Sequence, residues 1–202
     1  MASRQIDIQK SAGFSLIELT FVMAIILVLV AFLIATLLSR VEKGLETEAQ
    51  RGTGSIAVAI LNFYRDTGLW PIWQNGAQTG SGDNSFNYLV TMDGGYPDAG
   101  TTTYDFAVSS VIDTFTNQLI ANTPGYPVIN QKKRWHGPYL PKDPEDPWGN
   151  KYVVNIDTLK PGTAMKDVLV LSAGPDGVIQ TARNQDPAGF VLSGDDIVFH
   201  VR

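Results

Sequence analysis

The chain has 202 residues, 44% of them hydrophobic and 17% charged, with a formal net charge of −5. An acidic balance argues against nucleic-acid binding, which needs clustered lysine and arginine to displace counterions from phosphates; we interpret the densest basic stretch, residues 132–134, as a solvated turn. There is no cysteine, so disulfides cannot order an exported domain.

A membrane-length apolar run follows a short polar segment at the N-terminus. The 20 residues from Leu19 to Leu38 include no Asp, Glu, Lys or Arg. At about 1.5 Å per helical residue they span about 30 Å, the thickness of a bilayer's hydrocarbon core. A cleaved secretory signal has a shorter apolar core, of about 7–15 residues, before a small-x-small site. The sequence therefore predicts a transmembrane helix over residues 14–38, with Glu18 at its edge, where a carboxylate is costly without a reason.

Helical periodicity continues through residues 39–70. Apolar or small residues recur every three or four positions on one face of this segment: Val41, Leu45, Ala49, Gly52, Ile56, Ile60 and Phe63. Gly52 and Gly54 each weaken a helix by about 1 kcal/mol relative to Ala, so a bend could occur there. Gly68 and Pro71 indicate the helix end. The pattern predicts an amphipathic helix that packs against a domain.

Residues 71–135 are rich in Gly, Asn, Ser, Thr and Asp and carry little periodicity. Within them Val111, Phe115 and Leu119 are spaced four apart, which favours a helix over residues 109–122. We interpret residues 71–135 as a variable surface insertion.

The last third, residues 136–202, has the composition of a small sheet. Residues 151–156, 167–172 and 196–201 are short, rich in β-branched residues and bounded by turn residues. They predict an antiparallel sheet packed on the amphipathic helix, which is an α+β fold with a loop-rich C-terminal region. Trp148, before the Gly149-Asn150 turn, is predicted to fill the core beneath that turn.

Three separated motifs point to one family. "GFSLIEL" (residues 13–19) resembles the processing site of type IV pilins and type II secretion pseudopilins. "YLPKDPEDPWGNKY" (139–152) resembles a segment of the major, G-type pseudopilins. "LSAGPDGV" (171–178) and "GDDIVF" (194–199) are similar to that family's C-terminal loop. The chain is thus identified as a type IV pilin-like protein that resembles the type II secretion major (G-type) pseudopilin family.

The resemblance implies a prepilin leader at residues 1–13, cleaved by a prepilin peptidase between Gly13 and Phe14, with N-methylation of Phe14. Cleavage leaves a cationic amine on Phe14 at the positive end of a helix dipole. Glu18, one turn later, could offset that charge within its own chain or in a neighbouring one. The implied location is the bacterial inner membrane, crossed once, with the C-terminal domain in the periplasm.

The function that the resemblance implies is structural. The chain would polymerise through its N-terminal helix into a periplasmic homopolymeric filament, the pseudopilus, which drives protein export across the outer membrane. Its partners would be minor pseudopilins and an inner-membrane assembly platform with its ATPase. Two alternatives stay open: a type IV pilin of a surface filament for adhesion or motility, and a signal-anchored periplasmic enzyme or binding domain. An enzyme is not expected, because the two histidines are far apart in the sequence and no Gly-x-Ser-x-Gly occurs.

Asp176, Asp195 and Asp196 form one candidate metal constellation. In the resembled family the corresponding loop binds Ca²⁺, and carried over residue by residue this implies these three as ligands of a structural calcium ion. Eighteen residues separate Asp176 from Asp195, more than we expect in the family, and Asp186 within this stretch is a further candidate ligand. Without disulfides, a bound metal could order the C-terminal half. The spacing alone also fits solvated turn aspartates.

Overall fold

The computed structural model describes residues 13–74, 77–78, 87–100, 104, 112–160, 166–183 and 185–201. The chain divides into two compact units, Met1–Lys43 and Gly44–Arg202. One α-helix, α1 (Leu16–Thr67), contributes residues to both units. We describe each unit by itself.

In the first unit, α1 carries its apolar side chains on all sides and buries none of them. Leu27 is 65% exposed, Phe32 78% and Leu33 57%. This is a helix long and apolar enough to cross a membrane by length and composition. The apolar helix expected over residues 14–38 is therefore confirmed as a helix, which begins at Leu16.

The second unit holds a five-stranded sheet in the order β4-β3-β5-β6-β7. Its strands are β3 (Tyr88–Val90), β4 (Ile112–Thr114), β5 (Val153–Asn155), β6 (Leu169–Ser172) and β7 (Ile197–His200). Neighbouring strands are antiparallel except for β3 and β4, which run parallel. A separate two-stranded pair joins β1 (Trp73–Gln74) to β2 (Ala77–Gln78). Among the described residues there are also three short helical turns: η2 (Thr116–Ile120), η3 (Asp157–Leu159) and η4 (Pro187–Gly189).

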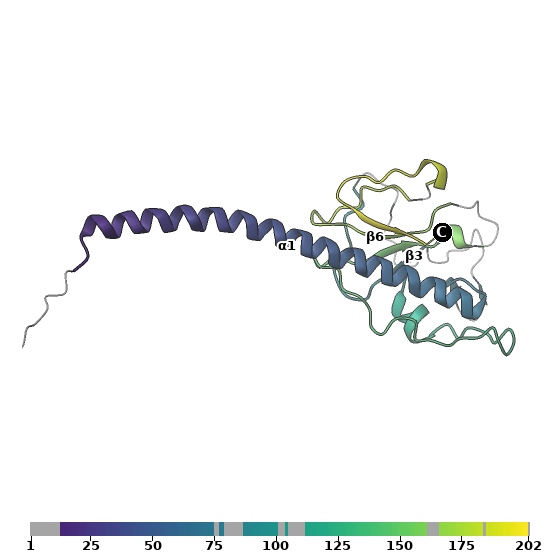
Figure 1. Cartoon of the computed structure of the whole chain (residues 1–202). Coiled ribbons are helices and arrows are strands. Elements are labelled where there is room, and N and C mark those ends of the chain that lie inside the picture. Colours follow the sequence, from purple (N-terminus) through teal and green to yellow (C-terminus); the bar gives the residue numbers. More distant parts are fainter. Residues whose placement is uncertain are drawn as a thin grey trace, which may run out of the picture. The chain divides into compact units, whose positions relative to one another are not determined.

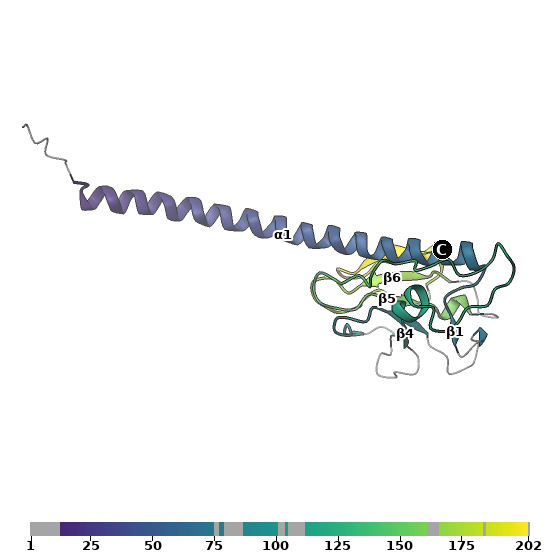
Figure 2. The same cartoon turned by 90° about the horizontal axis from the view of Figure 1, so that it is seen from below.

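From Gly44 onward, α1 lies along one face of this sheet, as the two views in Figures 1 and 2 show. A first core fills the space between them. Its fully buried members come from α1, the sheet and η2, and include Ile56, Ile60, Phe63, Leu89, Phe115, Leu119, Tyr152, Val154 and Val170. The α+β arrangement expected of a pilin-like fold is confirmed, with a mixed rather than a wholly antiparallel sheet.

The opposite face of the sheet is also covered. Tyr88, Val90, Val153, Leu169 and Leu171 point into a second core with Tyr104, Ala173 and Ile179, and Phe190 packs against it. Because side chains alternate along a strand, neighbouring residues of β5 and β6 serve different cores. The chain after β6 therefore forms a structural layer over the second face of the sheet.

Close packing explains Gly52 in α1. A Cβ at Gly52 would overlap the hydroxyl group of Tyr152, a residue with no exposed surface. The helix continues through Gly52 and Gly54, so the two glycines do not end it. α1 stops at Thr67, where Gly68 has a φ of 73° and its N–H donates to the Tyr64 carbonyl at 2.7 Å, as expected from the glycine.

Residues 71–135 are more than a surface insertion. They supply β3 and β4, and Leu89, Phe115 and Leu119 are completely buried in the first core. The helix expected over 109–122 is confirmed only as a short helical turn at 116–120 and is wrong at 112–114, which form β4. Pairing with β3 overrides the local helical pattern, because sheet hydrogen bonds and burial outweigh small differences in propensity. Residues 109–111 of that prediction lie outside the described ranges.

Trp148 does not fill the core as expected. It is half-buried and belongs to neither core, whereas Asp146 is only 5% exposed beneath the same turn. The Asp146 carboxylate accepts hydrogen bonds from the Ser172 hydroxyl (2.6 Å) and from the backbone N–H groups of Trp148 (3.2 Å) and Asn150 (3.3 Å). A buried acceptor, rather than an aromatic plug, therefore orders the Pro-Trp-Gly-Asn turn.

Candidate functional site

The predicted N-terminal processing segment is exposed from Gly13 onward. Phe14 is 84% exposed, and residues 13–15 precede the first helical residue, Leu16. Glu18 is exposed and lies in the first turn of α1. A carboxylate there is favourably placed for the positive end of the helix dipole. The arrangement leaves the Gly13–Phe14 bond outside regular structure, where an enzyme could reach it; residues 1–12 of the leader lie outside the described ranges.

The C-terminal loop brings three of the predicted aspartates into one hydrogen-bonded region. Asp176 follows the Gly174 turn and is exposed, and its own Oδ1 accepts from Val178 N–H at 2.8 Å. The Asp176 N–H donates to Asp195 Oδ2 at 3.3 Å. A Cβ at Gly174, whose φ is 65°, would overlap the Asp195 backbone. The two segments, 174–180 and 193–196, therefore touch.

Asp196 is the buried member of this group, at 4% exposure. Its Oδ2 accepts from the backbone N–H groups of Gln180 (3.0 Å) and Thr181 (2.6 Å). Its Oδ1 is buried and accepts no hydrogen bond. Burial raises the pKa of Asp196, those hydrogen bonds lower it, and neighbouring Asp195 raises it further. A cation would favour the ionised carboxylate and use the vacant lone pairs of Oδ1.

Asp186 makes different contacts. Its Oδ1 accepts from Ala188 N–H at 3.2 Å, and its Oδ2 lies 3.8 Å from Lys166 Nζ. Over the part of the chain that the structure describes, no three acidic, histidine or cysteine side chains form a group able to hold a metal. Asp176, Asp195 and Asp196 are thus connected, partly through backbone groups, without converging as a set of three carboxylates.

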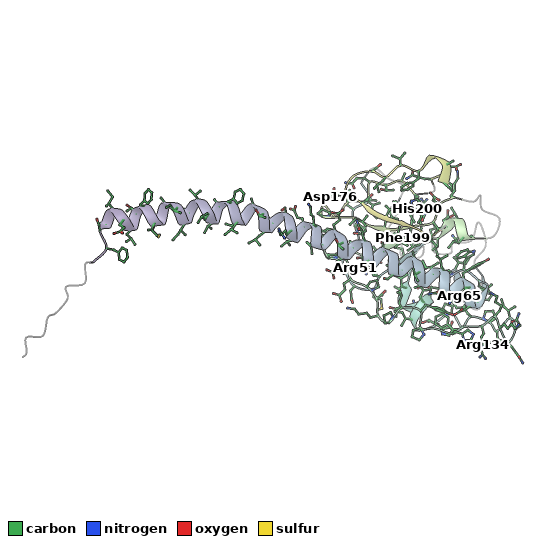
Figure 3. All side chains as sticks on the ribbon, in the orientation of Figure 1. Arg51, Arg65, Arg134, Asp176, Phe199 and His200 are labelled. Carbon is green, nitrogen blue, oxygen red and sulfur yellow. The ribbon has the colours of Figure 1, made fainter. Side chains whose placement is uncertain are left out.

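Gln180 was not predicted, yet it joins two of the aspartates. Its side-chain Nε2 donates to Asp176 Oδ2 at 2.5 Å, and its backbone N–H binds Asp196. The only signal in the sequence is an oxygen-bearing side chain four residues after Asp176. Being uncharged, it does not stand out beside the aspartates. Figure 3 shows Asp176 in this region and His200 on β7.

The histidines do not form a catalytic pair. His200 Nδ1 lies 3.4 Å from Asp167 Oδ2, and its ring packs edge-on against Phe190. The backbone N–H of His136 donates to the Tyr139 hydroxyl. His200 is exposed on the edge strand β7, in agreement with a surface position.

One comparison with known proteins, that with family models, agrees with the motifs at residues 139–152 and 171–178. Residues 115–187 match the family model described as type II secretion system (T2SS), protein G. No curated protein and no solved structure matches the chain. The matched region contains β5, β6, the buried Asp146 turn and Asp176, and begins at Phe115 in the first core. The match confirms the resemblance predicted from the motifs: over residues 115–187, the chain is similar to protein G of type II secretion systems, the major pseudopilin.

Proposed function

We propose that this protein is a structural subunit of a type II secretion pseudopilus. The observation that carries the proposal is the protein G match at residues 115–187 in a chain whose helix α1 includes an exposed, membrane-length apolar segment. The helix would anchor the subunit in the bacterial inner membrane, with the second unit in the periplasm. Copies would then polymerise through the helix into a filament that drives export across the outer membrane.

The apolar surface of α1 supports polymerisation. In the first unit, α1 buries no apolar side chain, and a helical segment of this kind needs lipid or other helices around it. Copies of the same helix offer the same surface, so lipid can be exchanged for neighbours as the subunit leaves the membrane. Minor pseudopilins, the assembly platform and its ATPase are the partners that this role requires.

Processing would set the register of the filament. Cleavage between Gly13 and Phe14 by a prepilin peptidase would expose a cationic amine four residues before Glu18, and N-methylation would follow on Phe14. Pairing of that amine with Glu18 of a neighbour would penalise any slip along the filament axis, since a slip leaves an unpaired charge among apolar side chains.

The C-terminal loop is proposed to bind a structural Ca²⁺ through Asp176, Asp195 and Asp196. Ca²⁺ takes six to eight oxygen ligands from carboxylates, amides and backbone carbonyls. The unpartnered Asp196 Oδ1 and the hydrogen-bonded approach of segments 174–180 and 193–196 support this proposal. The ion would stabilise the layer that covers the second core, in a chain without disulfides.

Mass spectrometry of the protein isolated from membranes tests the processing step. We expect a mature chain that begins with N-methylated Phe14. A mature protein that still begins at Met1 and remains monomeric in detergent and in membranes would refute both processing and polymerisation.

A secretion assay tests the export role. In the native host, a Glu18→Ala variant should be processed yet fail to form filaments and to export protein. Surface filaments with normal secretion in a deletion strain would instead favour the type IV pilin. For the loop, we expect EGTA to lower the thermal unfolding temperature; an unchanged temperature would refute the calcium site.

A further inference from the structure

The calcium proposal leaves the ligand set incomplete. Three carboxylates do not converge in the described part of the loop, and Ca²⁺ requires at least six oxygens. The missing ligands must therefore include neutral oxygens from side chains or from the backbone. Gln180, whose side chain binds Asp176 and whose backbone N–H binds Asp196, carries such an oxygen.

The Gln180 side chain is held between the two touching segments of the loop. Its Nε2 lies 2.5 Å from Asp176 Oδ2, while the Gln180 and Thr181 N–H groups fix Asp196 Oδ2. A Cβ at Gly194, whose φ is 69°, would overlap the Gln180 amide oxygen. Because Gly194 has no side chain, the amide has room beside it. Its positive φ is a backbone conformation that residues other than glycine rarely adopt.

Two oxygens at this place accept no hydrogen bond although both are buried: Gln180 Oε1 and Asp196 Oδ1. Asp196 as a whole is 4% exposed. Buried polar atoms are almost always paired, so both oxygens are available to accept from a donor or to bind a cation. A cation bound here would give each of these oxygens a partner.

The amide also has two usable orientations. The oxygen and nitrogen of a glutamine amide exchange places by a half-turn of the terminal group, with little change in shape. With a cation bound beside Asp176, a half-turn would direct Oε1 toward that cation in place of the Nε2–H donor, which binds Asp176 Oδ2 in this structure.

We propose that Gln180 is a further ligand of the loop, and that its amide oxygen binds a divalent cation together with the carboxylates of Asp176 and Asp196. The inference rests on the calcium site proposed above and adds to it a residue that belongs to this chain's long loop. It also explains how the site forms without a third converging carboxylate.

Calcium titration of the purified full-length chain in detergent tests the assignment, with Ca²⁺ alone as the probe and calorimetry as the readout. We expect Gln180→Ala to weaken Ca²⁺ binding about 10–100-fold. Gln185→Ala is the matched control, because Gln185 makes loop hydrogen bonds to Ala182 and Val191. It should leave the affinity within about twofold of the wild type, whatever its effect on stability.

A second variant covers the case in which Gln180→Ala does not fold. Gln180→Lys places an ammonium between Asp176 and Asp196, so the loop should fold through ion pairs and its unfolding temperature should no longer respond to Ca²⁺ or EGTA. Wild-type affinity in the variant that folds would overturn the role of Gln180 while leaving the calcium site in place. A wild-type chain that takes up no Ca²⁺ would overturn both.

Discussion

The two parts of α1, one in each unit, both carry large apolar side chains but place them in opposite environments. In the first unit, Leu27 and Phe32 are mostly exposed, whereas in the second Ile56, Ile60 and Phe63 have no exposed surface. The second half is covered by the sheet of its own chain. The first half has no cover within its unit, so its apolar surface must be met by lipid or by other helices. A hydrophobic pattern therefore predicts burial, but the tertiary structure decides what does the burying.

The largest expected effect comes from changing the part of α1 that lies in the first unit. Replacing Leu27 and Leu33 together by Arg places two charges near the middle of the apolar run, at about 2.5–3.5 kcal/mol each for membrane insertion. We expect the protein to be lost from the membrane fraction after alkaline carbonate extraction. The control pair Glu46→Arg and Gln50→Arg changes exposed positions of the same helix in the second unit. Full retention of the Leu27/Leu33 variant would show that the run does not span the membrane.

Two adjacent residues, Ile60 and Leu61, test how the part of α1 in the second unit packs on the sheet. Ile60 has no exposed surface, while Leu61 is 42% exposed on the same turn of α1. Ile60→Ala should lower the free energy of unfolding by about 2–5 kcal/mol, since it leaves a cavity in the first core. Leu61→Ala should cost less than about 1 kcal/mol. Urea denaturation in detergent measures both, and equal losses would contradict the packing of α1 on the sheet.

The Asp146 turn gives an intermediate effect with a pH signature. In Asp146→Asn, the side-chain NH₂ group replaces one of the buried oxygens that accept hydrogen bonds, so a donor faces a donor. We expect the free energy of unfolding to fall by about 1–3 kcal/mol at neutral pH. Burial raises the pKa of Asp146 above its usual value of 3.8. A raised pKa in the folded state means that this group's contribution to stability is largest at low pH and declines as the pH rises through that pKa.

Urea denaturation between pH 3 and pH 7 checks this sign. The free energy of unfolding should fall less steeply with rising pH in Asp146→Asn than in the wild type. Glu145→Gln is the matched control, because the Glu145 side chain is 71% exposed. Identical pH profiles for Asp146→Asn and the wild type would contradict the buried carboxylate.

The smallest effects come from two glycines of α1 that differ only in what they face. A Cβ at Gly54 would meet Phe199 at an ordinary contact distance of 3.6 Å, and one at Gly52 would overlap Tyr152. Gly54→Ala should therefore stabilise the protein by up to about 1 kcal/mol through helix propensity. Gly52→Ala should destabilise it by about 1–2 kcal/mol, because Tyr152 is locked in the core. Thermal unfolding compares the two, and changes of the same sign would refute this difference in packing.

Local patterns predicted much of the fold. The apolar and amphipathic halves of α1, its end at Gly68 and the three C-terminal strands follow from periodicity and turn residues, which act within a few positions of the chain. The parallel pairing of β3 with β4 could not be predicted in the same way. It joins residues 88–90 to 112–114 across a long connection, and their local pattern is helical or weak.

The residues of the candidate site also fall into those that the sequence predicted and those that it did not. Charge and motif order pointed to Asp176, Asp195 and Asp196, because carboxylates stand out in a sequence. Gln180 and the buried Asp146 were missed in their present roles, since each acquires its role from partners distant in the chain or from burial. Asp186, a candidate by position, contacts Lys166 instead.

The sequence by itself determined the membrane-length helix, the α+β class and the family resemblance, because these depend on composition, short-range periodicity and contiguous motifs. The tertiary structure decided the mixed sheet, the two cores on its opposite faces and the Gln180 contact between two carboxylates. Those features arise where segments far apart in the chain meet, and the free energy of such meetings depends on fit and on hydrogen-bond partners that no local pattern specifies.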